Sequence, residues 1–377
     1  MTENQLPHFN LNSFHLYSEK EEKGSTKPDL ILAYRSLGIA MRSYLSTYQK
    51  LHHYFKSGID DISHSPKYYE IYSETIIHIQ HFFELVIKDI LRDAHDIWTL
   101  DGIQVKDAVK NQFLLSLVVP KLKPSIIDTK KRTDIDDRSS VTFHESLARL
   151  ELLKGTSKFK RSKNIQLILE NKAILTFLTE LRNHVWHRGI TYLPLAEFDS
   201  LVCCFIFPIL SKMIRMKKYS GIRYYLPKPL RIKYDVLNEL TKQAASSSCD
   251  PYALLLLKEL GRSSFESPLG DYYRTKALKP KSQRGKMRRS LGISFAISSA
   301  NEQINKAKEI AISRRTELSD CPVCGEHCLV INEFADFTDD GIAFSFVTDV
   351  SCTLCSFQLY KDFPLNVNKF GIHNYFE

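Results

Sequence analysis

The chain has 377 residues, of which 43% are hydrophobic and 25% are charged, and its formal net charge is +9. This composition is typical of globular proteins, and the length is sufficient for two or three domains. The longest apolar run, LVCCFIFPIL, is shorter than the roughly 18 residues of a membrane-spanning helix, and the N-terminus lacks a secretory signal pattern. These features predict a cytoplasmic protein and argue against a membrane-spanning or exported one.

The first part of the chain carries the periodic apolar pattern of several long helices, after an N-terminal segment over residues 1–28. The predicted helices cover residues 28–58, 67–94, 105–120, 142–153, 164–187 and 194–217. Thr142 and Glu145 have the spacing of a capping box, and the polar segment 121–140 is predicted to be a loop. No run of alternating strands interrupts the pattern, so we expect residues 29–217 to form a helical bundle.

Residues 218–316 are predicted to form a basic region of helices and linkers. A compact helix there has Asp250 as its N-cap and Gly261 at its end, and a polar helix over 299–319 leads to the last cysteines. Residues 211–290 hold 19 Lys and Arg against 6 Asp and Glu, a surplus of 13 that exceeds the net charge of the whole chain.

The densest positive charge lies in the stretch YYRTKALKPKSQRGKMRRS. Its eight basic residues stand beside two tyrosines, a pattern typical of contact with a nucleic acid. A solvated lysine-rich surface is the alternative interpretation. The candidate nucleic-acid-binding residues are Arg274, Lys276, Lys279, Lys281, Arg284, Lys286, Arg288 and Arg289.

Four of the eight cysteines form two CxxC pairs that are separated by 27 residues. Each pair can direct two thiolates to one ion, and two pairs complete the tetrahedral shell of Zn²⁺. A shell filled by four protein ligands indicates a structural zinc site rather than a catalytic one. The predicted ligands are Cys321, Cys324, Cys352 and Cys355. Cys328 and His327 are alternative ligands whose spacing is less suitable.

The sequence around these cysteines predicts a small β ribbon over residues 317–377. The stretches CLVINEFA and IAFSFVT flank a DDG turn, and SFQLYKDF supplies a third strand. The acidic charge of the ribbon opposes contact with phosphates and favours docking onto protein, including a regulatory partner. The predicted fold class is therefore mainly α, with a helical bundle, a basic helical region and a C-terminal β zinc ribbon.

The helix predicted over 164–187 carries a polar cluster beside its apolar side. Because a helix turns by about 100° per residue, its large aliphatic residues share one side. These residues are Leu175, Leu178, Leu181 and Val185. Arg182 lies at the edge of this stripe, and Asn183 and His187 point away from it. We therefore expect the polar cluster at the surface, either solvated or in contact with a substrate.

The cluster RNHVWH resembles the R-x4-H signature of the HEPN superfamily (higher eukaryotes and prokaryotes nucleotide-binding domains), in which a polar residue follows the arginine. The earlier stretch IIHIQHFFELVIKDIL resembles the preceding family helix, which carries glutamate and lysine one turn apart, here Glu84 and Lys88. The resemblance covers roughly residues 30–215. Family members include ribonuclease toxins and effectors of bacterial antiphage defence, often dimers whose motifs face each other, and others are inactive scaffolds.

This resemblance implies a homodimeric endoribonuclease that needs no metal for catalysis, because RNA supplies its own 2′-OH nucleophile. It implies His187 as the general acid/base, Arg182 as the clamp on the transition-state charge and Asn183 as a positioning residue. Glu84 is a further candidate, although a Glu–Lys pair at this spacing usually only supports its helix. The alternatives are a non-catalytic nucleic-acid-binding or sensor protein that uses the bundle as a dimerisation scaffold, and a partner-binding antitoxin-like component.

Overall fold

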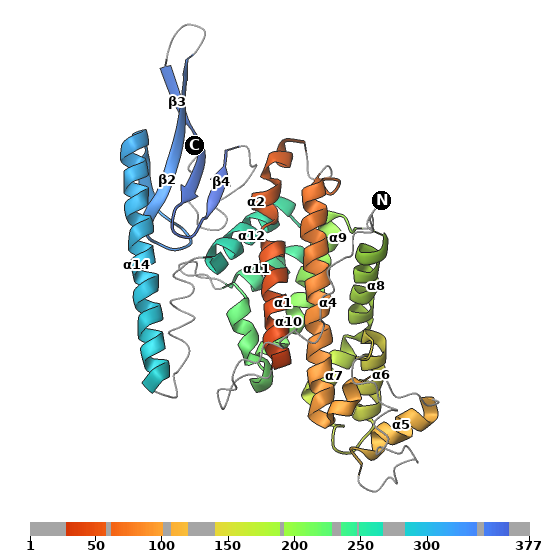
Figure 1. Ribbon diagram of the computed structural model, residues 1–377. Coiled ribbons are helices and arrows are strands. Elements are labelled where there is room, and N and C mark those ends of the chain that lie inside the picture. The colour runs from red at the N-terminus through yellow and green to blue at the C-terminus, as the bar shows by residue number, and fades with distance from the viewer. Residues whose placement is uncertain are drawn as a thin grey trace, which may run out of the picture.

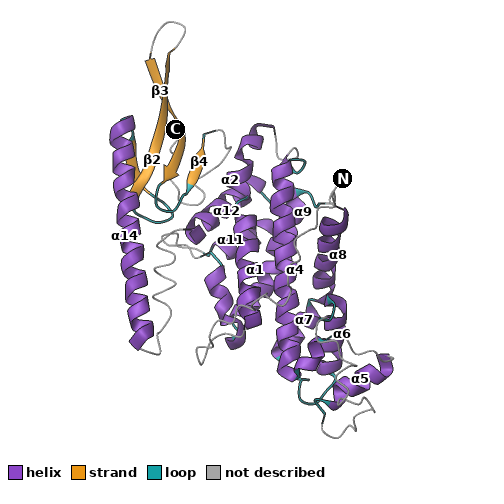
Figure 2. Ribbon diagram, viewed as in Figure 1, coloured by secondary structure: helices purple, strands orange, loops and turns teal. Residues whose placement is uncertain are grey.

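The computed structural model describes residues 28–57, 62–100, 107–119, 140–188, 192–227, 235–246, 249–266, 283–337 and 343–361. These residues are mainly helical, and a small antiparallel sheet that carries a cysteine cluster follows the helices (Figures 1 and 2). None of the described helices combines the length and the apolarity that crossing a bilayer requires. The N-terminal segment before Pro28 and nearly all of the predicted loop over 121–140 lie outside the described residues.

Three long helices stand side by side in the bundle: α1 (Pro28–Leu45), α4 (Pro66–Ala94) and α8 (Lys172–Arg188) (Figure 1). The central helix, α4, packs against both of the others. The hydroxyl of Ser65 caps α4 by accepting a hydrogen bond from the amide of Tyr68, and proline occupies its first turn. The apolar residues predicted to support this helix include Phe83 and Val86, and both are completely buried.

Shorter helices complete the bundle. They are α2 (Thr47–Leu51), α5 (Asp107–Ser116), α6 (Phe143–Lys154), α7 (Lys163–Glu170), α9 (Leu195–Ser200) and α10 (Phe207–Ile214). Three 3-10 turns, η2 (His52–Ser57), η3 (Asp96–Thr99) and η6 (Lys217–Tyr225), and the π-helical turn η5 (Leu201–Ile206) lie between or beside them.

Two segments predicted as continuous helices are interrupted. The first breaks at Ser46, whose hydroxyl donates to the carbonyl of Ser43 at 2.8 Å. The second breaks at Asn171, which separates α7 from α8 and donates its side-chain amide to the carbonyl of Leu167 at 2.8 Å. Polar side chains that bond nearby carbonyls compete with the helical backbone pattern, and the apolar periodicity does not register that competition.

The predicted capping box is half confirmed. The hydroxyl of Thr142 accepts a hydrogen bond from the amide of Glu145 at 3.3 Å and so caps α6. The carboxylate of Glu145 instead pairs with Lys110 and with Arg149, at 2.9 Å in each case. This glutamate therefore ties α6 to α5 through the ion pair with Lys110.

The prediction that Gly261 ends a helix is wrong. Asp250 caps α12 (Pro251–Glu266) as predicted, since its carboxylate accepts from the amide of Tyr252, but the helix continues for five residues past the glycine. A Cβ at Gly261 would lie 3.0 Å from a methyl of Leu45 and 3.1 Å from a methyl of Val236. The glycine therefore permits close packing of α12 against α1 and α11 (Val236–Ala244).

The polar helix predicted over 299–319 begins earlier and ends earlier than expected. It is α14 (Gln283–Arg314), and Arg315 follows it with a left-handed φ of 54°. The amide of Thr316 then donates to the carbonyl of Ala311 at 3.0 Å, which is the bond pattern of a Schellman motif. Glu317 and the next three residues form a strand instead of a last helical turn.

The sheet has four antiparallel strands in the order β1-β2-β3-β4. They are β1 (Glu317–Asp320), β2 (His327–Phe337), β3 (Ala343–Cys352) and β4 (Gln358–Tyr360). The predicted hairpin is confirmed in β2 and β3, where Phe334 pairs with Phe346 in register. The DDG turn between these strands lies outside the described residues. Helix α14 packs along β1 and β2 (Figure 1).

Half of the eight predicted nucleic-acid-binding residues lie within the described residues, and half lie outside them. Arg274, Lys276, Lys279 and Lys281 lie outside the described residues. Arg284, Lys286, Arg288 and Arg289 lie on the first turns of α14. The domain boundary between residues 217 and 218 stays a prediction. Helices α11 and α12 follow this boundary in the chain and pack on α1, α2 and η5.

A buried ion pair joins α12 to α9. The ammonium of Lys258 lies 2.5 Å from a carboxylate oxygen of Asp199, and the two side chains are 0% and 3% exposed. The hydroxyl of Tyr44 donates to the same oxygen at 3.0 Å, and its ring lies 4.5 Å from the ammonium. Each charge is therefore compensated inside the protein. A charge buried there without a partner would be strongly unfavourable.

We predict that Asp199→Ala lowers the free energy of unfolding by about 3–5 kcal/mol, because it leaves Lys258 buried without its counter-charge. The double variant Asp199→Asn with Lys258→Met removes both charges and is expected to recover most of this loss. Equilibrium unfolding in urea measures all three proteins.

The matched control is Glu70→Ala, which breaks the exposed ion pair with Lys67 and is expected to change the free energy of unfolding by less than about 1 kcal/mol. Equal effects of Asp199→Ala and Glu70→Ala would contradict a special role for the buried pair.

Candidate functional site

The predicted apolar stripe on α8 is confirmed, and the polar cluster lies beside it at the surface. The stripe residues Leu175, Leu178, Leu181 and Val185 are 0–7% exposed. Arg182 and Asn183 are half-buried, and His187 is exposed one turn further along the helix. The sequence therefore predicted the placement of these side chains correctly.

Arg182 is held in place by its neighbours on the same helix. Its guanidinium donates to the side-chain oxygen of Asn183 at 3.0 Å and lies 5.8 Å from the centre of the Trp186 ring. Asn183 thus contacts Arg182, and its predicted role as a positioning residue stays a prediction. Trp186 is 62% exposed, so its other face is open to solvent or to a partner.

Glu84 lies on α4 and is bonded within its own helix. Its carboxylate accepts from Lys88 at 2.6 Å and from Gln80 at 3.2 Å. Lys88 also donates to the hydroxyl of Ser140 at 2.9 Å, so the pair helps to hold α4 against the segment that leads into α6. Burial alone would raise the pKa of Glu84, but the hydrogen bonds from Lys88 and Gln80 and the charge of Lys88 hold it below its ordinary value. Glu84 is therefore an ionised acceptor near neutral pH and not a proton donor.

His81 is a residue of this region that the sequence interpretation missed. It lies one turn before Glu84 on α4, and its Nδ1 is 2.8 Å from the hydroxyl of Ser36 on α1. His81 is exposed, but the groups packed beside its ring partly desolvate the imidazole and lower its pKa; the carboxylate of Glu84 opposes this shift, and the charges of Lys88 and Arg182 reinforce it. The imidazole therefore lies within the electrostatic reach of Arg182 on α8. Its signal in the sequence was the HxxE spacing inside the stretch that resembled the family helix.

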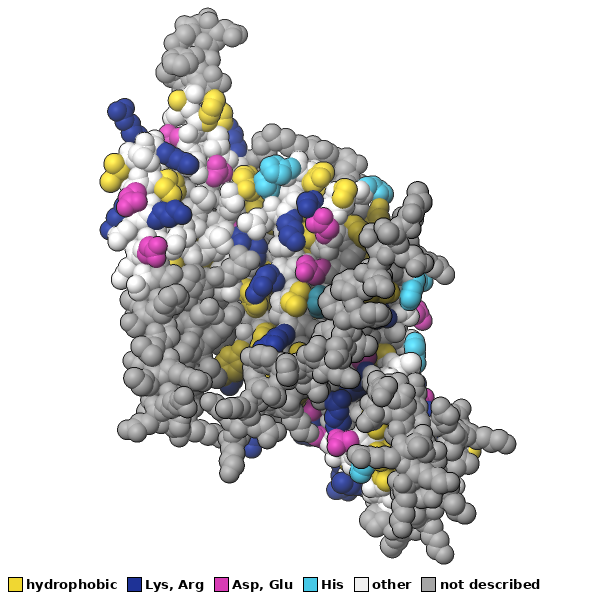
Figure 3. Space-filling model, viewed as in Figure 1, with side chains coloured by type: hydrophobic (Ala, Val, Ile, Leu, Met, Phe, Trp, Pro, Cys, Tyr) yellow, Lys and Arg dark blue, Asp and Glu magenta, His cyan; other side chains and the backbone are white. Residues whose placement is uncertain are grey.

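The visible face of the molecule carries mixed charge. In Figure 3, Lys and Arg side chains lie near Asp and Glu side chains in the region of α1 and α4, rather than gathering into one basic patch among the coloured residues. On α1, the exposed residues Leu32, Arg35, Ile39 and Arg42 follow one side of the helix.

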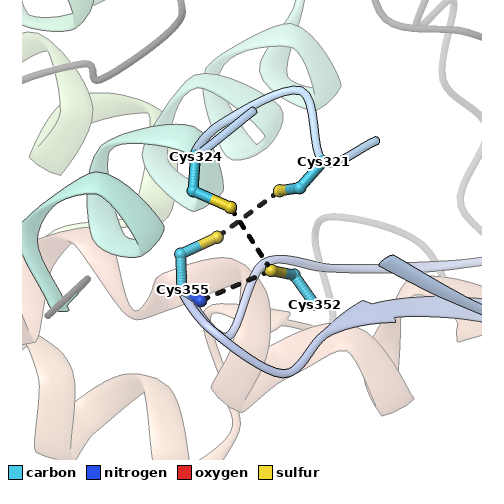
Figure 4. Close-up of side chains that lie close together, drawn as sticks. All are labelled: Cys321, Cys324, Cys352 and Cys355. Atoms are coloured by element: carbon cyan, nitrogen blue, oxygen red, sulfur yellow. Dashed lines mark hydrogen bonds between the residues drawn. The ribbon is translucent and has the colours of Figure 1, made fainter. Parts of the chain in front are cut away.

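The four cysteines predicted as metal ligands come together between the two turns that carry them (Figure 4). Their sulfurs all lie within 4.8 Å of one another, and each of the four residues is at most 3% exposed. Cys321 and Cys355 are 3.5 Å apart at sulfur, and Cys324 and Cys352 are 3.7 Å apart. A tetrahedral ion with sulfur ligands at about 2.3 Å requires sulfurs about 3.8 Å apart, so the cluster fits such an ion.

The local backbone aims these sulfurs. Gly325 has a φ of 75°, which closes the first turn so that its amide donates to the carbonyl of Cys321 at 2.8 Å. In the second turn, the amide of Cys355 donates to the sulfur of Cys352 at 3.4 Å. Ser356 occupies the position that corresponds to Gly325 and has a φ of 54°, which is unfavourable for a residue with a side chain.

The second turn docks directly onto α12. Arg262 donates to the hydroxyl of Ser356 at 3.0 Å and to its carbonyl at 2.5 Å, and it forms a two-point ion pair with Glu259. Glu259 also accepts from the amide of Gln358 in β4 at 2.9 Å. The side chains of Arg262 and Glu259 are 1% and 0% exposed. Burial raises the pKa of the Glu259 carboxyl, although the hydrogen bond and the charge of Arg262 oppose the rise.

Aromatic contacts extend this docking surface to α2 and the turn after it. The amide of Tyr360 donates to the hydroxyl of Tyr48 at 3.1 Å, and the ring of Tyr360 stacks on His52 with ring centres 3.8 Å apart. The acidic ribbon, which was expected to dock onto protein, therefore contacts the helical part of its own chain. The sequence interpretation missed Glu259 and Arg262. The feature that could have indicated them is their position as charged residues next to the leucine run of α12.

Comparison with models of protein families, with curated proteins and with solved structures found no match to this chain. The resemblance to the HEPN superfamily therefore rests on the motif residues themselves.

We predict that Arg262→Met releases the ribbon from α12, because Glu259 then loses the counter-charge of Arg262 and Ser356 loses its two hydrogen bonds from the guanidinium. Amide hydrogen exchange over residues 352–361 is expected to accelerate, and the free energy of unfolding to fall by about 3–5 kcal/mol.

The double variant Glu259→Gln with Arg262→Met serves as the control, since it removes both charges and keeps an acceptor for the amide of Gln358. Unchanged exchange in Arg262→Met would show that the ribbon is held by its other contacts.

Proposed function

We propose that this protein is a metal-independent endoribonuclease of the HEPN type that acts as a toxin or antiphage defence effector. The observation that supports this most directly is the surface pairing of Arg182 with Asn183 on α8, one turn before the exposed His187. The helix that carries them packs beside α4, which bears Glu84 and His81. This packing of the two motif-bearing helices supports the proposal.

In the proposed reaction, the 2′-OH of RNA loses its proton and attacks the adjacent phosphorus atom, while the bond from phosphorus to the 5′ oxygen breaks and that oxygen leaves as a hydroxyl. Arg182 binds the phosphate oxygens as negative charge develops, because a guanidinium presents a fixed fork of donors. Asn183 holds the guanidinium in position through its side-chain oxygen. His187 transfers the proton, since an imidazole can accept or give one near neutral pH. Glu84 contributes negative charge near the site and not a proton.

We propose further that two copies of the chain meet through α8. Trp186, which lies beside Arg182 on this helix, is 62% exposed, and a large apolar side chain at a surface favours contact with a partner. Such a homodimer would bring two R-x4-H clusters to one interface. The basic residues between 274 and 289 are proposed to hold the RNA backbone, and the acidic ribbon to bind a regulatory protein.

The ion held by Cys321, Cys324, Cys352 and Cys355 is proposed to be Zn²⁺ in a structural role. Four thiolates and tetrahedral spacing suit this ion, and they fill its coordination shell. The site would stabilise the ribbon, and catalysis on α8 would not use the metal.

We predict that His187→Ala lowers RNA cleavage by about 100- to 10,000-fold and that Arg182→Ala has an effect of at least about 100-fold. Both side chains lie outside the buried stripe, so the far-UV circular dichroism and the melting temperature are expected to stay unchanged. Cleavage of total RNA by the purified chain, in EDTA over minutes, gives the rates, and the products should end in 2′,3′-cyclic phosphate and 5′-hydroxyl.

His184→Ala is the matched control, because this histidine is on the same helix but outside the R-x4-H pair. The His184→Ala protein should cleave RNA normally. Full cleavage by both the His187 and Arg182 variants would overturn the assignment, as would products with 5′-phosphates. Binding of RNA by a wild-type protein that cleaves nothing would favour the non-catalytic sensor.

We predict that the protein purified without chelator holds about one zinc ion per chain and that Cys321→Ser lowers this content and destabilises the ribbon. Cys249→Ser, which changes an exposed cysteine outside the cluster, should keep both the zinc and the stability. Elemental analysis measures the metal, and a wild-type protein without zinc would refute the prediction.

A further inference from the structure

A fifth cysteine lies against the metal-binding cluster. The sulfur of Cys328 is 3.4 Å from that of Cys352 and 3.9 Å from that of Cys324. Its side chain is completely buried, so these two sulfurs form part of its immediate surroundings. Cys328 is not one of the four cysteines whose sulfurs all lie within 4.8 Å of one another. Its sulfur lies outside the tetrahedron of those four, beside the edge between Cys324 and Cys352.

The spacing of three of these sulfurs is that of metal ligands. Cys324, Cys328 and Cys352 form a triangle with sides of 3.4, 3.7 and 3.9 Å. The face of a tetrahedral site with metal–sulfur bonds of about 2.3 Å is a triangle with sides of about 3.8 Å. An ion that binds two of these thiolates is therefore close to the third.

The backbone holds Cys328 in this position from both sides. Its amide donates to the carbonyl of Glu326 at 2.9 Å, next to the first cysteine turn. Its carbonyl accepts from the amide of Thr353 at 3.2 Å, in the second turn. Cys328 lies at the irregularity of β2 between His327 and Leu329, and these two neighbours pair with Asp320 and Ser319 of β1. The thiol is therefore fixed between the two pairs of ligands.

We infer that Cys328 is a reserve ligand of this centre, which takes the place of Cys324 or Cys352 when either thiolate is lost. Each vacated position lies within 3.9 Å of the Cys328 sulfur. Rotation about the Cα–Cβ bond of Cys328, with a small shift of the ion, brings its sulfur to that position. The ligand class is a thiophilic divalent cation, for which thiolates are the preferred donors. The inference rests on the proposed metal centre and is independent of the ribonuclease proposal.

Packing is the competing explanation, because a buried cysteine also serves as a small apolar side chain. The two explanations differ in what happens after loss of one ligand. A packing residue leaves the ion with three thiolates. A reserve ligand restores four, and it does so only at the two positions that its sulfur contacts.

The test loads the full-length chain with Co²⁺, whose thiolate-to-cobalt absorption grows with the number of cobalt–sulfur bonds. Cys324→Ser and Cys352→Ser are each expected to keep the wild-type intensity, because Cys328 supplies the fourth thiolate. Adding Cys328→Ser to either variant should remove about a quarter of the intensity, one bond in four. Cys328→Ser alone should match the wild type.

Cys355→Ser is the matched control, because the sulfur of Cys355 lies against Cys321 on the other side of the cluster. It should lose about a quarter of the intensity with or without Cys328→Ser. The two test variants lie in different turns, which guards against a folding defect particular to one of them. Loss of the same intensity in Cys324→Ser and Cys352→Ser, or failure of both to hold cobalt, overturns the proposal. If the wild type binds no cobalt, the metal centre itself is refuted.

Discussion

The helical part of this protein and its C-terminal ribbon are joined around one buried group, the guanidinium of Arg262. A buried cation needs a counter-charge and acceptors for its donors, and here α12 and the ribbon both supply them. Glu259 provides the negative charge from the same helix, and Ser356 provides a hydroxyl and a carbonyl from the second cysteine turn. The helical part and the ribbon are therefore each incomplete at this point without the other.

The same interaction explains the backbone of Ser356. Its left-handed conformation is unfavourable for a residue with a Cβ, and glycine occupies the corresponding position in the first turn. At Ser356 the side-chain hydroxyl accepts from Arg262, which a glycine would not allow. Because Cys355 is the preceding residue, metal binding at the cluster and docking onto α12 act on adjacent peptide units. We therefore expect the state of the metal centre to affect how firmly the ribbon contacts the helices.

The R-x4-H surface lies on α8, which packs on α4, whereas α12 packs on α1. The chain thus separates its proposed chemistry from its metal centre, and the helices α1 and α4 stand between them. The buried pair of Lys258 and Asp199 joins α12 to the segment that follows α8. Helix α12 contributes three buried charges, two to the ribbon contact and one to this pair, so it organises both contacts.

The sequence by itself determined the helical bundle, the hairpin around the cysteines, the four clustered thiols and the surface position of Arg182, Asn183 and His187. Apolar periodicity and ligand spacing are local properties, so they can be read along the chain. Only the tertiary structure decided that Gly261 is a packing position, that Glu259 and Arg262 are buried, and that Cys328 touches the cluster. These features depend on which distant segments approach one another, and such approaches are set by the summed burial of many side chains rather than by neighbours in sequence.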